Sequence, residues 1–174
     1  RRHSMKYAII AVTMGAALPA SAEIVAATPD HYTLRHEAVS TLSPEDMWER
    51  LIEPDTWWHP DHTYSGSAEN LWLNPNAGGP WMESWDGNVV EHGRVLSLIE
   101  GEMLRLDAPF GPLQGMAVNV VWTITIEPDG DGTRITFDEI ANGSSASGLD
   151  KIAPAVDGVK QQAMARLVDP GTTN

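Results

Sequence analysis

The chain has 174 residues, a length that fits one domain with a hydrophobic core of its own. Hydrophobic residues make up 42% of it, which argues against a disordered chain, and its formal net charge is −13. Beyond residue 22 the basic side chains are scattered, whereas nucleic-acid binding needs a clustered positive surface. There is no cysteine, which excludes disulfides, thiolate nucleophiles and thiolate metal sites.

The first 22 residues match a secretory signal peptide. Residues 1–6 are basic, an apolar run follows over 8–18, and small residues lead to a cleavage site after Ala22. The alternative, a buried N-terminal helix, would end at Pro19 and has no capping residue. The apolar run is too short for a permanent membrane span. We therefore predict an exported protein, periplasmic or secreted, with no stable membrane insertion after cleavage.

The rest of the chain is predicted to form a single α+β domain over residues 32–169. We assign 23–31 to a leader and 170–174 to a tail, and a start at Met5 would make residues 1–4 upstream or added residues. The first predicted strand is 32–40. A helix follows, because Ser43 is a good N-cap and Pro44 suits the first helical position; Pro54 ends that helix. A second short helix or a loop is predicted after it.

From residue 69 the apolar period changes to two, which is typical of strands. Glycine, asparagine and aspartate separate the predicted strands as turn residues. The strands are 69–75, 80–85, 88–100, 103–108, 115–128 and 132–141. After residue 148 apolar residues recur at three- and four-residue steps, which predicts a long helix that begins near Pro154 or kinks there. We expect a curved antiparallel sheet of about seven strands wrapped around this helix, with a cavity between them.

The stretch "DTWWHPDHTYSG" (55–66) holds two histidines three residues apart, His59 and His62. Imidazole and carboxylate are acceptable zinc ligands, and Asp61 lies between the histidines. However, Pro60 prevents a smooth helix through the pair, and the sequence brings no third ligand close. The alternative is a turn in which Asp61 accepts backbone hydrogen bonds. We predict no metal and no other cofactor, and His59 and His62 are the candidates should a metal bind.

The chain has seven tryptophans, and two of them flank a carboxylate on one strand face: Trp81 and Trp85, with Glu83 between them. Core packing accounts for some tryptophans, but a cavity lined by indoles would suit a planar apolar ligand or a quaternary amine. Burial among indoles should raise the pKa of Glu83, which would suit a general acid or base. Pairing with Arg94 or Arg105 as a structural bridge is the alternative.

A set of local motifs extends over residues 32–168: "SPEDMWERLIEPDTWW", "HTYSG", "AGGPWMESW", "EHGRVLSLIEGEMLRL", "FGPLQG" and "GTRITF". With the order of elements, they resemble the START / polyketide cyclase / lipid-transport superfamily (SRPBCC, the helix-grip fold). Within it, the chain looks most like the branch related to chaperone ATPase activator domains, in its exported bacterial members. The resemblance implies a cavity for hydrophobic small molecules but no single reaction, because members include carriers, sensors, cyclases and co-chaperones.

We therefore expect binding or carriage of a small hydrophobic or aromatic molecule, and favour a ligand-binding protein over an enzyme. The predicted lining is Trp81, Glu83, Trp85, Phe110, Trp122, Val156 and Lys160, with Trp57 and Trp58 near the entrance. Glu139 raises the same question as Glu83. A cyclase or hydratase that uses Glu83 as general acid or base, with a histidine, is the first alternative. The second is a protein-interaction module resembling a chaperone activator.

Overall fold

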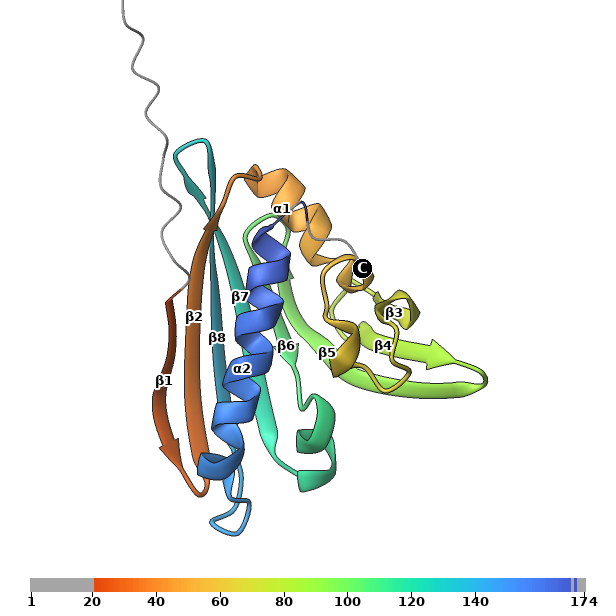
Figure 1. The fold of residues 1–174 in the computed structure, drawn as a ribbon, viewed down its shortest axis with the longest axis vertical. Helices are drawn as coiled ribbons and strands as arrows, with labels where there is room; N and C mark the ends of the chain where they lie inside the picture. Colours follow the sequence, from red (N-terminus) through yellow and green to blue (C-terminus); the bar gives the residue numbers. More distant parts are fainter. Residues whose placement is uncertain (1–20, 170, 172–174) are drawn as a thin grey trace, which may run out of the picture.

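The computed structural model describes residues 21–169 and 171, and it has one antiparallel sheet of eight strands (Figure 1). The neighbours in the sheet run β1-β2-β8-β7-β6-β5-β4-β3. The strands are β1 (Ser21–Thr28), β2 (His31–Ser40), β3 (Leu71–Leu73), β4 (Pro80–Trp85), β5 (Asn88–Ile99), β6 (Met103–Asp107), β7 (Asn119–Asp129) and β8 (Gly132–Asn142). The predicted α+β class and the antiparallel sheet are confirmed.

Across the described residues, two α-helices and four short 3-10 helices accompany the sheet. They are α1 (Pro44–Leu51), η1 (Pro54–Thr56), η2 (Pro60–His62), η3 (Ala68–Asn70), η4 (Gly111–Met116) and α2 (Leu149–Val168). Ser43 caps α1 as predicted, because its side chain accepts a hydrogen bond from the backbone N–H of Asp46. Figure 1 shows α2 lying along one face of the sheet beside β2 and β8, while the β4–β5 hairpin extends away from it.

The core lies between this face of the sheet and the helices. The predicted alternation along the strand before residue 128 is confirmed in β7, where the side chains that face the core are Val120, Trp122, Ile124 and Ile126. Trp57 and Trp81 are also fully buried and join the same cluster. A second cluster packs the first half of α2 against β2, β7 and β8, around Tyr32 and Leu34.

Three boundaries differ from the sequence prediction. Residues 23–31, assigned to a leader, form most of β1 and its turn into β2. The side chains of residues 23–28 in this edge strand are exposed, so no burial pattern signals it, and its pairing with β2 makes it a strand. α2 begins at Leu149, so Pro154 lies inside the helix. The strand predicted from residue 115 begins at Asn119, because η4 and a left-handed Ala117 (φ 54°) come first.

Most of the predicted signal peptide, residues 1–20, lies outside the described residues, so cleavage after Ala22 stays a prediction. Cleavage there would leave β1 from Glu23 onward, including its pairing with Arg35 of β2. Within the part of the chain that the structure describes, no helix is both long and apolar enough to cross a membrane.

Two glycines should respond in opposite ways to substitution by alanine. A Cβ at Gly132 would lie 2.1 Å from the carbonyl oxygen of Ser40, a backbone atom of β2, whereas a Cβ on Gly158 of α2 meets open space. We expect Gly132→Ala to lower the free energy of unfolding by about 1–3 kcal/mol through overpacking. Gly158→Ala should raise it by about 0.5–1 kcal/mol through helix propensity. Urea unfolding checks both; a Gly132→Ala variant as stable as the native protein would contradict the β2–β8 packing.

Candidate functional site

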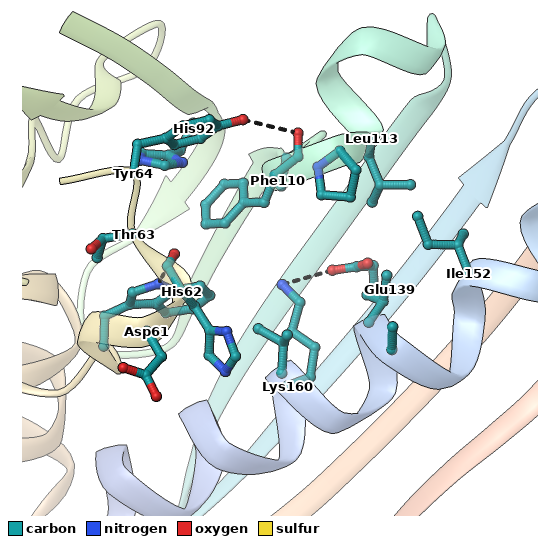
Figure 2. Close-up of a pocket in the computed structure, with 17 residues that line it drawn as sticks. Asp61, His62, Thr63, Tyr64, His92, Phe110, Leu113, Glu139, Ile152 and Lys160 are labelled. Atoms are coloured by element: carbon teal, nitrogen blue, oxygen red, sulfur yellow. Dashed lines mark hydrogen bonds and ion pairs between the residues drawn. The ribbon is translucent and has the colours of Figure 1, made fainter. Parts of the chain in front are cut away.

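A cavity of about 470 Å³ lies between α2, η4 and the segment that contains η2 (Figure 2). Side chains from β5 and β8 and from the chain after β6 complete its wall. The lining residues are Trp58, Asp61, His62, Thr63, Tyr64, His92, Ala108, Phe110, Gly111, Pro112, Leu113, Glu139, Ile152, Ala155, Val156, Val159 and Lys160. Most of this wall is apolar, as is usual in small-molecule sites.

Two hydrogen bonds join the segment after η1 to the elements across the cavity. His62 Nε2 lies 2.8 Å from Gln162 Oε1 on α2. Tyr64 OH donates to the carbonyl oxygen of Gly111, at the start of η4, over 3.4 Å (Figure 2). Residues 58–64 therefore form one rim of the cavity, and this rim is hydrogen-bonded to α2 on one side and to η4 on the other.

A buried ion pair lies in the wall formed by α2 and β8. Lys160 Nζ is 2.7 Å from Glu139 Oε2, and the two side chains are only 3% and 2% exposed. Tyr32 OH donates to Glu139 Oε1 over 2.6 Å, and the Lys160 ammonium lies 3.1 Å from the centroid of the Trp122 ring. A buried ammonium is strongly destabilising unless it is paired, so the carboxylate and the indole face together hold this charge.

Burial governs the titration of this group of residues. It lowers the pKa of Lys160, while the charge of Glu139 acts in the opposite direction. Burial also raises the pKa of Tyr32, and the neighbouring carboxylate of Glu139 raises it further. Tyr32 therefore stays a neutral hydrogen-bond donor at physiological pH.

A second buried acid, Glu83, lies behind the cavity wall. Its Oε2 accepts from the backbone N–H of Tyr64 at 3.0 Å and lies 2.8 Å from His92 Nε2. Its Oε1 accepts from the backbone N–H of Ser65 at 2.5 Å. The prediction that the pKa of Glu83 rises is wrong. Burial acts in that direction, but the hydrogen bonds from Ser65, Tyr64 and His92 outweigh it and lower the pKa.

His92 connects Glu83 to the cavity. Because Glu83 is ionised, it accepts a hydrogen bond from the protonated Nε2 of His92, which leaves Nδ1 as the unprotonated nitrogen of the neutral ring. Burial lowers the pKa of His92, although its hydrogen bond to Glu83 opposes this, so the ring is neutral at pH 7. His92 lines the cavity and Glu83 does not. The carboxylate therefore orients an imidazole that can meet a bound molecule.

The structure brings four of the predicted lining residues to the cavity wall: Trp58, Phe110, Val156 and Lys160. The others lie elsewhere. Trp57, Trp81 and Trp122 pack edge-to-face or tilted against Trp58 in the core behind the wall, and each is fully buried. Trp57, expected near the entrance, donates its ring N–H to the Leu51 carbonyl instead.

Trp85 and Glu83 were also predicted to line the cavity, and neither lies in its wall. Both share the parity of Trp81 on β4, as predicted, but β4 lies near the far edge of the sheet, away from α2 (Figure 1). Trp85 is partly exposed at the end of that strand. Strand parity gives the face on which a side chain lies, but not its position along the curved sheet.

Tyr32 is not among the residues predicted from the sequence, and the pairing of Glu139 with Lys160 is not predicted either. Glu139 alternates with Ile135 and Phe137 on the core face of β8, which is the signal that it is buried. Lys160 lies 21 positions later on α2, and Tyr32 lies at the start of the domain on β2. No local spacing links these three residues, so only the packing of α2 on the sheet joins them.

The two histidines considered for a metal make other contacts. His59 Nδ1 accepts from the backbone N–H of Asp61 at 3.1 Å, and His62 bonds to Gln162. Within residues 21–169, no group of three or more histidine and carboxylate side chains is placed to hold a metal ion.

No family model matches the chain, and no curated protein matches it. Solved structures do. A Chromobacterium violaceum protein matches at 22% identity and a TM-score of 0.53, over 78% of this chain and 94% of its own. The Aha1 dimer from Colwellia psychrerythraea, studied in solution, matches at 14% identity and a TM-score of 0.54, over 79% and 93%. CalU16 from Micromonospora echinospora matches at 12% identity and a TM-score of 0.51, and the match covers 90% of this chain and 88% of CalU16. At such identities the likeness is one of fold alone.

Glu83→Gln should destabilise the protein in a pH-dependent way. An amide cannot accept from three donors as the carboxylate does, so we expect a loss of about 2–3 kcal/mol in the free energy of unfolding at pH 7. The folded pKa of Glu83 is lowered from 4.5, so its contribution is present above pH 4.5 and is lost as the pH falls through the folded value.

Urea unfolding of native and Glu83→Gln proteins at pH 7 and at lower pH checks this, and the difference should shrink in acid. Glu91→Gln is the matched control. Glu91 is 41% exposed and pairs with Arg94 on the same strand, so its loss should cost about 0.5 kcal/mol or less. A difference that stays constant with pH would show that Glu83 is not the titrating group.

Proposed function

We propose that this protein binds or carries a small hydrophobic or aromatic molecule in the cavity beside α2. The cavity itself is the main support for this proposal. Its wall is largely apolar and contains one buried ion pair, Lys160–Glu139. A volume near 470 Å³ lies within the range of about 300–1,000 Å³ that is typical of small-molecule sites. Trp58, Phe110 and Val156 offer flat and branched apolar surface for such a ligand.

The proposal includes membership of the START / polyketide cyclase superfamily and export from the cytoplasm. The order of elements and the fold likeness to solved proteins support the first. The basic start, apolar run and small residues before Glu23 support the second. The ligand would then be a molecule met outside the cytoplasm. No cofactor or nucleic-acid partner forms part of the proposal.

The protein-interaction alternative has support only from the fold. The Aha1 dimer shares the sheet and the C-terminal helix, and its name is that of the branch the sequence resembles. A shared fold at 14% identity brings no partner with it. The cavity has the size and the apolar wall that suit a small molecule, and it therefore supports the small-molecule proposal over the protein-interaction alternative.

Val156→Phe should fill the cavity and weaken binding. Val156 is half-buried on α2 and lines the cavity, so a larger ring can enter it without disturbing the core. Calorimetric titration of the purified protein with naphthalene should show saturable binding, and we expect about a tenfold or greater loss of affinity in the variant. Native mass spectrometry of the same samples detects any co-purified ligand.

Val89→Phe is the control, because Val89 is 64% exposed on β5 and lies outside the cavity wall. It should bind naphthalene like the native protein. If native protein shows no saturable binding of naphthalene or of other apolar probes and no co-purified ligand, the proposed function is wrong. If Val156→Phe binds with native affinity, this cavity is not the site.

A second candidate function is general acid–base catalysis on the bound molecule, of the cyclase or hydratase kind. The Glu83–His92 pair favours it, because a buried carboxylate holds a neutral imidazole that faces the cavity. The roles differ from the sequence prediction. His92 would be the catalytic base, and Glu83 a positioning residue that fixes its tautomer.

This candidate predicts an activity that depends on the unprotonated form of His92. The rate should rise with pH through the pKa of His92, which lies below its ordinary value of 6.5, and it should be level above that value. His92→Asn should lower the rate about 10²- to 10⁴-fold, without a matching loss of naphthalene binding. A screen of hydration and cyclisation substrates checks this. An activity that His92→Asn leaves unchanged would exclude the imidazole.

A further inference from the structure

The Lys160–Glu139 pair in the cavity wall has hydrogen-bonding capacity that the protein does not use. Lys160 Nζ and Glu139 Oε2 lie 2.7 Å apart as an ion pair, which occupies one of the three donors of the ammonium and leaves a second lone pair on the carboxylate oxygen. Across the described residues, neither atom has another hydrogen-bond partner. Both side chains line the cavity, and Figure 2 shows their polar ends projecting from α2 and β8 toward the space below η4.

The positions of the two residues explain why they leave this capacity open. Nζ has three donors, and the face of Trp122 accepts one side of the ammonium without satisfying an N–H bond in the ordinary way. The other oxygen of Glu139 is already taken by Tyr32. The pair therefore offers a bound molecule one donor group, Nζ, and one acceptor, Oε2, side by side. Buried polar atoms left without partners are rare in proteins, and a ligand is one way to satisfy them.

The charge of the site decides what kind of polar group fits there. The ammonium and the carboxylate sum to zero, and both are buried. A carboxylate ligand would have to share Lys160 with Glu139 and would add a net negative charge in an apolar surrounding, which is unfavourable. A cation would meet the corresponding penalty beside Lys160.

We propose that the polar end of the ligand is a neutral group whose acceptor and donor lie on one atom, as in a hydroxyl, or on one carbon, as in a primary amide. The acceptor would take a hydrogen bond from Lys160 Nζ, and the donor would give one to Glu139 Oε2. The apolar body would then lie along Phe110 and Val156. This inference rests on the proposed function and names the chemical class of its ligand.

Four probes with the same two-ring body test the inference by calorimetric titration at pH 7: naphthalene, 2-naphthol, 2-naphthoate and 2-naphthylmethylammonium. We expect 2-naphthol to bind the native protein about tenfold or more tightly than naphthalene, since a hydrogen bond to a charged group is worth that much or more. The carboxylate and the ammonium probes should both bind more weakly than 2-naphthol.

Variants locate the effect at the ion pair. Lys160→Met alone would leave Glu139 buried without its counter-ion and could fail to fold, so the main variant is the double substitution Lys160→Met/Glu139→Gln, which removes both charges together. It should lose most of the native preference for 2-naphthol, because both charges are gone and the amide in place of Glu139 can offer only a weaker, neutral hydrogen bond. Lys151→Met is the control, because Lys151 is exposed near the start of α2 and lies outside the wall; it should keep the native preference.

Four other results would contradict the inference or the proposed function. Tightest binding of 2-naphthoate would make the site an anion site and overturn the inference while leaving the proposed function intact. Equal binding of naphthalene and 2-naphthol by the native protein would do the same. If the double variant keeps the full native preference for 2-naphthol over naphthalene, the ion pair does not recognise the polar group of the ligand. If no probe binds, the proposed function fails, and this inference fails with it.

Discussion

The fold depends on one geometric constraint: a single long helix must cover one face of an eight-stranded sheet. A helix is about 10 Å wide, so α2 covers about two of the strands, which lie about 4.8 Å apart. It packs along β2, which lies between β1 and β8 in the sheet (Figure 1). The remaining face is covered by α1, the short helices and a cluster of large aromatic side chains. The cavity lies where these coverings meet the edge of α2 without filling the space.

The same constraint explains why charges are found in the interior. Lys160 lies on the side of α2 that faces β8, so its ammonium can reach neither solvent nor a surface acid. It is tolerated because Glu139 projects from β8 to meet it, with Tyr32 and Trp122 as further partners. One side of this group is packed against protein and the other side faces the cavity. The ion pair thus supports the packing of α2 on the sheet, and we propose that the same pair contacts the ligand.

The two buried acids serve different purposes because their surroundings differ. Glu83 accepts hydrogen bonds from the backbone at residues 64 and 65 and from His92, so it fixes the cavity rim and holds an imidazole in one tautomer. Glu139 faces an ammonium and a phenol, with one oxygen still available to the cavity. Charge-assisted hydrogen bonds from several donors make Glu83 a structural anion, whereas Glu139 holds Lys160 and Tyr32 and also lines the cavity.

The sequence by itself determined what depends on local pattern. Ser43 and Pro44 specify the start of α1, alternation along β7 and β8 specifies which side chains enter the core, and turn residues separate the strands. Only the tertiary structure decided which buried side chains reach the cavity. Trp81 and Trp122 have the predicted parity but lie behind the wall, whereas Trp58 lies in it. β1 is a strand only through pairing, since its own side chains are exposed. The meeting of Lys160 with Glu139 depends on the docking of α2 on the sheet, which no short window of sequence encodes, whereas His92 meets Glu83 across the β4–β5 hairpin, whose register includes a bulge.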